Sequence, residues 1–353
     1  METKIIRVNE KTVTKEELMS AAEVIKEGGL VAFPTETVYG LGADGLDEVA
    51  AKKIYEAKGR PSDNPLILHI ASVEALKELA VDIPRSAYKL ADAFWPGPLT
   101  MILKKSDRVP YGTTGGLDTV AVRMPNHPIA LKLIEASGRY IAAPSANSSG
   151  KPSPTMAKHV MDDLNGRIHM VVDGGNSVLG LESTIVDLTS ERPCILRPGY
   201  ITQAMLEDVV GPVGYDKVVL LKKADPSLKP KAPGMKYKHY APYGDVTIFD
   251  GEEELVIQRI NQEVEKQIAL GKSVGIIATE ETKSRYPKGL VKCVGTRAVE
   301  DTIAAGLYAI LREFDELKTE IIYSESFYDD QLGQAIMNRL VKASGYKIVK
   351  VTD

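Results

Sequence analysis

Residues 33–42 read FPTETVYGLG, residues 57–70 read AKGRPSDNPLILHI, and residues 143–155 read APSANSSGKPSPT. Each segment combines hydroxyl side chains with Gly, Pro and a few charges, beside a short apolar run that predicts a buried strand. Glycine lets a ligand approach the backbone closely, and hydroxyl groups are neutral hydrogen-bond donors. The segments therefore predict strand ends and loops that bind a polyanion and a small polar substrate together.

The remaining patterns divide the chain into two bodies and a connector. Its 353 residues exceed what one hydrophobic core usually serves. Residues 1–211 hold many short β-branched runs with connections of varied length, which predicts an α/β domain with a twisted mixed sheet. Residues 245–353 alternate strands with long helices, which predicts a smaller Rossmann-like parallel sheet, although no GxGxxG follows its first strand.

Local signals predict several helices directly. Thr14 and Glu17 have the spacing of a capping box, so a helix is expected to begin there and to run through Ile25 before the Gly28-Gly29 pair ends it. Helical spacing also covers residues 48–58 in the first body and residues 252–270 and 298–317 in the second.

Residues 212–244 form the connector. They include five Pro, and between Asp216 and Lys238 there are seven Lys against two Asp. No apolar periodicity accompanies this composition, which is typical of a linker. A solvated tether is the simpler interpretation, and a lid that meets phosphates is the functional one.

Composition excludes several classes of protein. A net charge of −4 argues against a protein that coats nucleic acid. No apolar run approaches the roughly 20 residues that span a bilayer, and the N-terminus has no secretory signal pattern. Cys194 and Cys293 are far apart and have no metal-ligand spacing, so neither a disulfide framework nor a zinc site is expected. The cytoplasm is the expected compartment.

Lys58 and Arg60 follow a predicted helix and flank Gly59. Basic residues there can simply complement the helix dipole. Alternatively, the Lys58 ammonium binds a phosphate as a point charge, and the planar Arg60 guanidinium binds a phosphate or a carboxylate through its paired donors.

Arg123 lies in the short apolar strand pattern TVAVRMP, where an unpaired charge is costly to bury. A carboxylate partner is therefore expected, and either a bound amino acid or a structural Asp or Glu can supply it. Other candidates also have a structural interpretation. The Thr35 hydroxyl can hydrogen-bond to the backbone of its own turn. His69 lies between two apolar residues, as a histidine of the core would, and the Ser-rich segment after Ala143 can be a surface turn.

The three quoted segments, in this order, resemble the YrdC family. From about Val8 to the C-terminus the chain resembles the family's longer two-domain members, the threonylcarbamoyl-AMP synthases. The resemblance implies a nucleotidyltransferase, an L-threonylcarbamoyladenylate synthase, that converts L-threonine, bicarbonate and ATP into threonylcarbamoyl-AMP and pyrophosphate. The product is expected to feed threonylcarbamoyladenosine modification of tRNA next to the anticodon, through a separate transferase complex. Mg²⁺ is expected to accompany ATP, with unknown protein ligands.

The family's joint Lys-x-Arg and Ser-x-Asn signature is matched by Lys58, Arg60, Ser145 and Asn147, which are the expected catalytic residues. By resemblance, the residues around ATP are Lys58, Arg60, Asn64, Thr119, Ser145, Ser153 and Arg197. By the same resemblance, the residues around L-threonine are Thr35, His69, Arg123, Ala143 and Ser183. The segment APGMKYKHYAP, residues 232–242, matches the longer members, and a lid built on Lys236, Tyr237, His239 and Tyr240 is expected.

Two other functions compete with this one. An RNA-binding module is disfavoured by the acidic composition, so direct tRNA binding is expected to be weak. A carbamoyltransferase that uses carbamoyl phosphate is disfavoured because related maturation enzymes carry acylphosphatase and zinc-finger segments, which this chain lacks.

Overall fold

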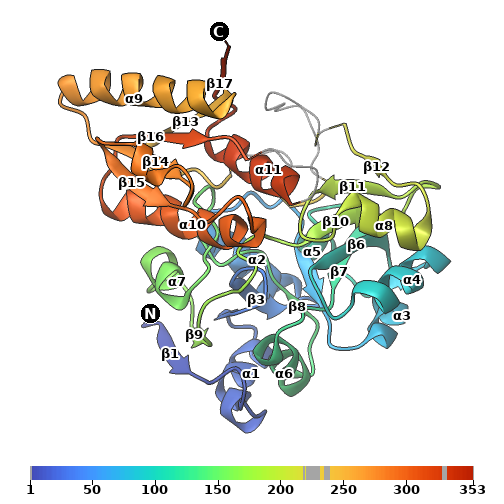
Figure 1. The fold of residues 1–353 in the computed structure, drawn as a ribbon. Coiled ribbons are helices and arrows are strands. Elements are labelled where there is room, and N and C mark those ends of the chain that lie inside the picture. The colour runs from blue at the N-terminus through green and yellow to red at the C-terminus, as the bar shows by residue number, and fades with distance from the viewer. Residues whose placement is uncertain (1, 218, 220–230, 234–238, 328–331, 353) are drawn as a thin grey trace. The chain divides into compact units, whose positions relative to one another are not determined.

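The computed structural model describes residues 2–217, 219, 231–233, 239–327 and 332–352 (Figure 1). These residues form two compact units. Among the described residues, the first unit contains 2–149 and 153–233, whereas the second contains 150–152 and everything from 239 onward. Each unit has its own sheet.

The first unit is built on one mixed sheet. Its described strands follow one another across the sheet in the order β1-β9-β2-β3-β8-β4-β7-β6-β10-β11-β12, and β5 pairs with β6. The sheet contains both parallel pairs, such as β4·β7, and antiparallel pairs, such as β6·β7, which confirms the predicted mixed sheet. The strands are β1 (Lys4–Arg7), β2 (Val31–Phe33), β3 (Gly40–Asp44), β4 (Ile67–His69), β5 (Ala80–Val81), β6 (Leu99–Lys105), β7 (Thr119–Arg123), β8 (Ile141–Ala142), β9 (Met170–Asp173), β10 (Thr184–Asp187), β11 (Cys194–Arg197) and β12 (Gly214–Tyr215).

Local signals bound several helices of this unit, and the expected capping box opens a 3₁₀ turn (Glu16–Leu18) that leads into α1 (Met19–Lys26). The Thr14 amide donates to the Glu17 carboxylate, and the Glu17 amide donates back to Thr14 Oγ1, as a capping box requires. Asp47 caps α2, and Gly59 ends it with φ 61°. The α-helices are α1 (Met19–Lys26), α2 (Glu48–Lys58), α3 (Leu76–Leu79), α4 (Arg85–Phe94), α5 (Tyr111–Thr114), α6 (Pro128–Ser137), α7 (Ala157–Leu164) and α8 (Gln203–Val210), with short 3₁₀ turns at Glu16–Leu18 and Val73–Ala75.

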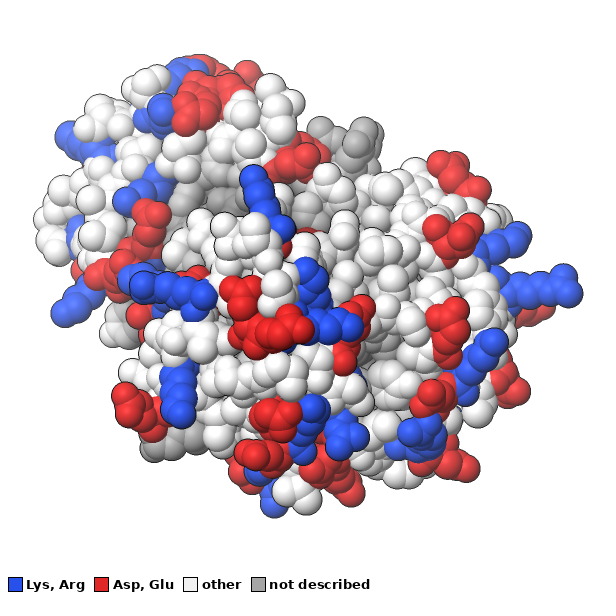
Figure 2. Space-filling model, turned by 90° about the horizontal axis from the view of Figure 1, so that it is seen from below, with Lys and Arg blue, Asp and Glu red and all other residues white. Residues whose placement is uncertain are grey.

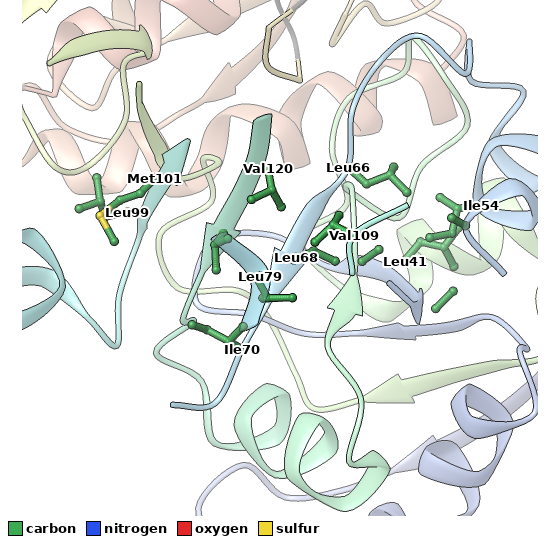
Figure 3. Close-up of a cluster of buried hydrophobic side chains, with 14 of the residues drawn as sticks. Leu41, Ile54, Leu66, Leu68, Ile70, Leu79, Leu99, Met101, Val109 and Val120 are labelled. Carbon is green, nitrogen blue, oxygen red and sulfur yellow. The ribbon is translucent and has the colours of Figure 1, made fainter. Parts of the chain in front are cut away.

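Alternate side chains of the central strands enter two separate clusters of buried hydrophobic residues. Ala32 belongs to the larger cluster, whereas its neighbours Val31 and Phe33 belong to the other. Successive side chains of a strand point to opposite faces of its sheet, so both faces of β2 are buried. Figure 3 shows part of the larger cluster, which includes Leu68 of β4 and Ile54 of α2.

The glycines after Phe33 are not all loop residues, which corrects the expectation for that segment. Gly40–Asp44 forms β3, which pairs antiparallel with β2 and β8. A Cβ atom on Gly42 would lie 2.6 Å from Ile141 Cγ2 and 2.7 Å from Phe33 Cε1. Glycine is therefore required here by close packing inside the sheet.

The second unit confirms the predicted parallel sheet. Its described strands are all parallel, in the order β15-β14-β16-β13-β17. Figure 1 shows α9 on one side of these strands and α10 and α11 on the other. The elements are β13 (Asp245–Gly251), α9 (Glu253–Ala269), β14 (Val274–Ala278), a 3₁₀ turn (Lys283–Arg285), β15 (Leu290–Cys293), α10 (Glu300–Glu316), β16 (Ile321–Glu325), α11 (Gly333–Ala343) and β17 (Ile348–Val351).

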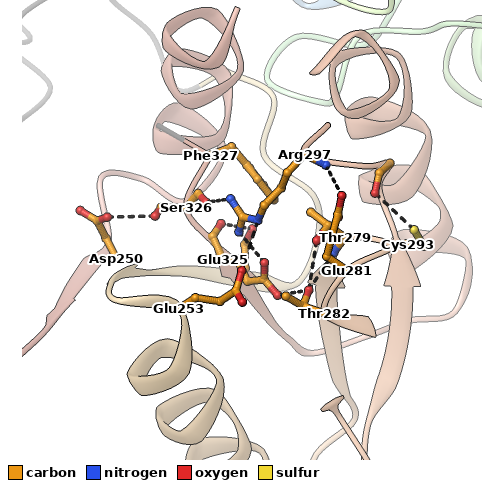
Figure 4. Close-up of polar contacts among 12 residues, drawn as sticks. Asp250, Glu253, Thr279, Glu281, Thr282, Cys293, Arg297, Glu325, Ser326 and Phe327 are labelled. Atoms are coloured by element: carbon orange, nitrogen blue, oxygen red, sulfur yellow. Dashed lines mark hydrogen bonds and ion pairs between the residues drawn. The ribbon is translucent and has the colours of Figure 1, made fainter. Parts of the chain in front are cut away.

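A buried carboxylate connects the loops that follow these parallel strands (Figure 4). Glu325, at the end of β16, is 2% exposed. It accepts hydrogen bonds from Thr282 Oγ1 at 2.5 Å, Tyr286 Oη at 2.8 Å and Arg297 Nη2 at 2.6 Å. The Arg297 guanidinium also lies 5.3 Å from the centre of the Phe327 ring. This cluster therefore stabilises the carboxyl edge of the second sheet.

Replacing Glu325 with Ala would leave three donors without their acceptor. We expect the free energy of unfolding of the second unit to fall by about 3 kcal/mol, as for other broken buried ion pairs. Far-UV circular dichroism in urea follows both units, whereas Trp95, the chain's single tryptophan, reports on the first. The dichroism transition of Glu325→Ala should move to lower urea and separate from the fluorescence transition.

The matched control is Glu265→Ala, which removes a surface carboxylate paired with Lys288. Both of its transitions should stay at the wild-type urea concentrations, because exposed ion pairs contribute little. A single wild-type-like transition in Glu325→Ala would contradict the role given to this carboxylate.

Candidate active site

Polar side chains from neighbouring strands line up across the first sheet. His69 of β4 is in register with Arg123 of β7, and Arg123 is in register with Thr100 of β6. Thr100 Oγ1 lies 2.8 Å from the hydroxyl of Ser183, which precedes β10. Residues in register on paired strands point to the same face. The strand register therefore brings together His69, Arg123 and Ser183, which are far apart in sequence, and adds Thr100, which sequence reasoning did not identify.

Arg197 of β11 continues this row. Its Nε donates to the Ser183 carbonyl at 3.0 Å, and its Nη2 donates to the Ser183 hydroxyl at 3.2 Å. Ala143 joins the row from the other side, because its amide donates to the Ile67 carbonyl of β4 at 2.9 Å. Arg197, which is expected to contact the nucleotide, and Ser183, which is expected to contact threonine, are therefore in direct contact.

Thr35 stabilises the turn after β2. Its hydroxyl donates to the Val38 carbonyl at 2.6 Å and lies 2.8 Å from Thr37 Oγ1. These contacts fit the interpretation of Thr35 as a residue that satisfies its own turn, and its expected contact with threonine stays a prediction. Thr37 Oγ1 also accepts from Arg123 Nη1 at 2.9 Å, which connects the turn to the polar row.

Arg123 has its carboxylate partner within the chain. The side chains of Arg123 and Glu36 are 5% and 11% exposed, and Arg123 Nη2 lies 2.6 Å from Glu36 Oε1. Arg123 Nε donates to the Gly97 carbonyl at 3.3 Å. Glu36 was not among the predicted site residues, although it lies in the first quoted segment, where an acid between two threonines was a usable signal.

The two halves of the Lys-x-Arg and Ser-x-Asn signature meet in the folded chain. The buried Lys58 ammonium donates to the backbone carbonyls of Ser145 and Asn147. The Ser149 amide donates to the Lys58 carbonyl at 2.8 Å, and the Ser145 hydroxyl donates to Asn147 Oδ1 at 2.5 Å. Lys58 therefore holds the Ser-rich loop against the end of α2.

Arg60 shapes the loop that follows α2. Its Nε donates to the Asn64 carbonyl at 3.3 Å and its Nη2 to the Pro65 carbonyl at 3.1 Å. Asn64 is 2% exposed, and its Oδ1 has no hydrogen-bond partner among the residues that the structure describes. Thr119 begins β7, four residues before Arg123, so the two are about 13 Å apart along the strand.

Two buried carboxylates that the sequence did not single out position the Ser-rich loop. Ser153 Oγ donates to Glu182 Oε1 at 2.5 Å, and both residues are buried. The Ser148 amide donates to Asp163 Oδ2 of α7 at 3.1 Å. The loop is therefore held from α2, from α7 and from the segment before β10.

The predicted lid is only partly described. Lys236 and Tyr237 lie outside the described residues. His239 and Tyr240 belong to the second unit, where the rings of Tyr240 and Tyr308 have centroids 5.2 Å apart. The role of this segment as a lid stays a prediction.

The face in Figure 2 carries Lys and Arg interspersed with Asp and Glu. The residues described on that face show no continuous basic patch of the kind expected for nucleic-acid binding. In the described ranges of the chain, no helix is long and apolar enough to cross a membrane.

His69 is neutral in the folded protein. Burial, and then the nearby Arg123 guanidinium, lower its pKa from 6.5 to about 3. Nδ1 lies 3.1 Å from the Ile67 carbonyl, which can accept a hydrogen bond from the neutral ring. A neutral imidazole beside Arg123 avoids placing two positive charges side by side in a buried site.

This neutrality predicts a pH dependence of stability. Between pH 6.5 and about 3 the unfolded chain binds a proton at His69 that the folded chain does not bind. The free energy of unfolding should therefore fall as the pH is lowered through this window, by up to about 1.4 kcal/mol per pH unit from this group.

Urea unfolding of the wild type and of His69→Gln at several pH values measures that contribution, which should be absent from the variant. In imidazole NMR spectra, His69 should keep its neutral signals at pH 5.5, while a histidine peptide in the same tube titrates. A His69 midpoint near 6.5 would contradict the assignment.

Known proteins resemble the whole chain. A family model described as "Telomere recombination" matches residues 23–199, and one described as "Threonylcarbamoyl-AMP synthase, C-terminal domain" matches residues 201–345. A threonylcarbamoyl-AMP synthase of Pyrococcus abyssi is 51% identical over 349 residues, which are 99% of this chain and 100% of that protein. Another, from Bacillus subtilis, is 50% identical over 335 residues, 95% of this chain and 94% of that protein.

A solved structure agrees with these sequences. The crystal structure of P. abyssi Sua5 complexed with L-threonine matches with a TM-score of 0.93 at 50% identity and covers 99% of this chain and 100% of that one. The matches extend over both units and over the segments that carry the polar row and the Ser-rich loop. The chain therefore belongs to the two-domain threonylcarbamoyl-AMP synthase family, whose members are transferases of the nucleotidyltransferase type.

Proposed function

We propose that this chain condenses L-threonine, bicarbonate and ATP into threonylcarbamoyl-AMP and pyrophosphate. The observation that carries the proposal is the contact of the Lys58 ammonium with the carbonyls of Ser145 and Asn147, which unites the two halves of the family signature. The full-length similarity to named threonylcarbamoyl-AMP synthases supports the reaction. The complex of P. abyssi Sua5 with L-threonine supports the amino-acid substrate.

The polar row is the proposed threonine site. Arg123 has the charge and planar geometry to bind the substrate carboxylate, and neutral His69 lies beside it on β4. The Thr35 turn is connected to Arg123 through Thr37, and Ser183 lies on the opposite side of the row. Ala143, whose amide is bonded to the carbonyl of Ile67 on β4, lies beside the row.

The Ser-rich loop and the segment after α2 form the proposed nucleotide site. Hydroxyl and amide groups that are already held in place bind phosphates without reorganising. The residues proposed to surround ATP are Lys58, Arg60, Asn64, Thr119, Ser145, Asn147, Ser153 and Arg197. Because Arg197 contacts Ser183, the nucleotide and threonine sites adjoin at this pair.

The chemistry requires mainly orientation and charge neutralisation. In the proposed sequence, the threonine amine and bicarbonate give N-carboxy-threonine and water. A carboxylate oxygen of this species then attacks the α-phosphorus of ATP and pyrophosphate leaves. Holding two polar reactants in a fixed geometry removes much of the entropic barrier to such a step. No covalent enzyme intermediate is needed.

Mg²⁺ is proposed to arrive with the phosphates of ATP, where it would neutralise their charge. Among the residues that the structure describes, no group of three or more His, Cys, Asp and Glu side chains could hold a metal ion. The ion is proposed to be held mainly by phosphate and water, and no catalytic step is assigned to it. The product is proposed to pass to a separate tRNA-modifying transferase in the cytoplasm.

The two competing functions have less support. An RNA-binding module needs a basic face, the chain has a net charge of −4, and the face drawn in Figure 2 has mixed charge. A carbamoyl-phosphate-dependent transferase would form AMP from ATP only when carbamoyl phosphate is supplied. Full-length similarity to named threonylcarbamoyl-AMP synthases favours bicarbonate and threonine.

The proposal predicts that pyrophosphate release from ATP requires threonine and bicarbonate together. A coupled phosphate assay with inorganic pyrophosphatase measures it, with each substrate omitted in turn. L-serine, which lacks the methyl group, is the matched substrate control and should react more slowly. Equal release with serine, or release in bicarbonate-depleted buffer, would contradict the substrate assignment.

Arg123→Ala should weaken threonine far more than ATP. Loss of a charge-assisted hydrogen bond corresponds to roughly ten- to a hundredfold in affinity. The KM values for threonine and ATP measure the two effects in one protein. Because the substitution leaves the Glu36 carboxylate without its ion-pair partner, a thermal melt checks that the variant is folded. An unchanged threonine KM in a folded variant would move the carboxylate-binding role to another residue.

A further inference from the structure

The Arg123–Glu36 ion pair is buried but incompletely hydrogen-bonded. Arg123 uses Nε for the Gly97 carbonyl and Nη1 for Thr37 Oγ1, so only Nη2 faces the carboxylate. Arg123 Nη2 and Glu36 Oε1 are 2.6 Å apart, but they are poorly aligned for a hydrogen bond. Among the described residues, Arg123 Nη2 and the two Glu36 carboxylate oxygens therefore have no hydrogen-bond partner.

Unsatisfied polar atoms of this kind are rare and costly in protein interiors. An unpaired buried donor or acceptor costs about 1–3 kcal/mol, and more when it is charged. Here the unsatisfied atoms lie together and include a positively charged donor and two negatively charged acceptors, because a guanidinium nitrogen lies beside two carboxylate oxygens. A ligand that supplies one acceptor and one donor group at that place would satisfy both.

The charge of the pair restricts the ligand. A free anion or a free cation would add net charge to a buried, neutral pair, which is unfavourable. A zwitterion adds none. In an α-amino acid the ammonium nitrogen and the nearer carboxylate oxygen are about 3 Å apart by bond geometry. That separation resembles the 2.6 Å between Arg123 Nη2 and Glu36 Oε1.

We propose that Glu36 binds the α-ammonium group of threonine while Arg123 binds its carboxylate, so that Glu36 selects a zwitterionic amino acid. This inference rests on the proposed function, because it takes threonine as the ligand of the polar row. The neighbouring groups fit this role. Thr37 holds Arg123 in place, and His69 is in register with Arg123 and carries no charge that would repel the ammonium group.

A different arrangement predicts the opposite result. If Glu36 only occupied Arg123 in place of the substrate carboxylate, it would compete with threonine. Neutralising Glu36 would then tighten threonine binding, whereas the proposed ammonium contact requires that binding weaken.

The experiment measures binding to the full-length protein by isothermal titration calorimetry. The ligands are L-threonine and 2,3-dihydroxybutanoate, in which a hydroxyl group replaces the amine. Wild type should prefer threonine by at least about tenfold, as expected for a charge-assisted contact. Glu36→Gln should weaken threonine by about ten- to a hundredfold and lose most of that preference.

Two controls separate this effect from a loss of folding. Glu78→Gln neutralises a carboxylate that pairs with Arg108 at the surface and should bind both ligands like wild type. ATP affinity and the melting temperature of each variant report the fold. If Glu36→Gln fails to fold, Glu36→Asp keeps the charge, and it should bind threonine more weakly than wild type but still prefer it to the analogue.

Unchanged or tighter threonine binding by folded Glu36→Gln would overturn the role of Glu36, and so would a wild type that binds both ligands equally. If the wild type does not bind threonine, the proposed substrate is wrong, and the role inferred for Glu36 is wrong as well.

Discussion

The cost of burying the Arg123 guanidinium constrains the whole polar centre of the first unit. A buried guanidinium needs its charge balanced and its donors occupied. The Glu36 carboxylate balances the charge, and the Gly97 carbonyl and the Thr37 hydroxyl each accept from one donor. These groups come from two distant parts of the chain, the turn after β2 and the segment before β6. The conformation of the turn after β2 is therefore coupled to the position of β7.

The same constraint extends to the neighbouring strands. Register places His69 and Thr100 on either side of Arg123, and the imidazole is uncharged because it is buried beside a permanent cation. Thr100 then connects the row to Ser183, which Arg197 holds through both its backbone and its side chain. A site that is organised before the substrates bind suits a reaction that depends on orientation more than on a covalent intermediate.

Lys58 shows how a signature residue can have a structural task as well. Its ammonium is bound to two backbone carbonyls of the Ser-rich loop, which fixes the path of that loop near the end of α2. Asp163 and Glu182 hold the loop from two further directions. The lysine therefore determines where the hydroxyl and amide groups of Ser145 and Asn147 lie, whatever charge it also presents to a phosphate.

Local signals in the sequence determined much of this protein. The capping box at Thr14 and the helical spacing of residues 48–58 act within a few residues, so these elements followed from the sequence, and the structure added the caps of α2 at Asp47 and Gly59. Alternating strands and long helices were enough to predict the second, parallel sheet, and the quoted motifs were enough to indicate the family. Tertiary structure alone decided that Gly40–Asp44 is a strand, that Glu36 is the partner of Arg123, and that Lys58 binds the loop at Ser145. These outcomes depend on which strands pair and in which register, and contacts between residues as distant as 58 and 145 exist only after the sheet has formed.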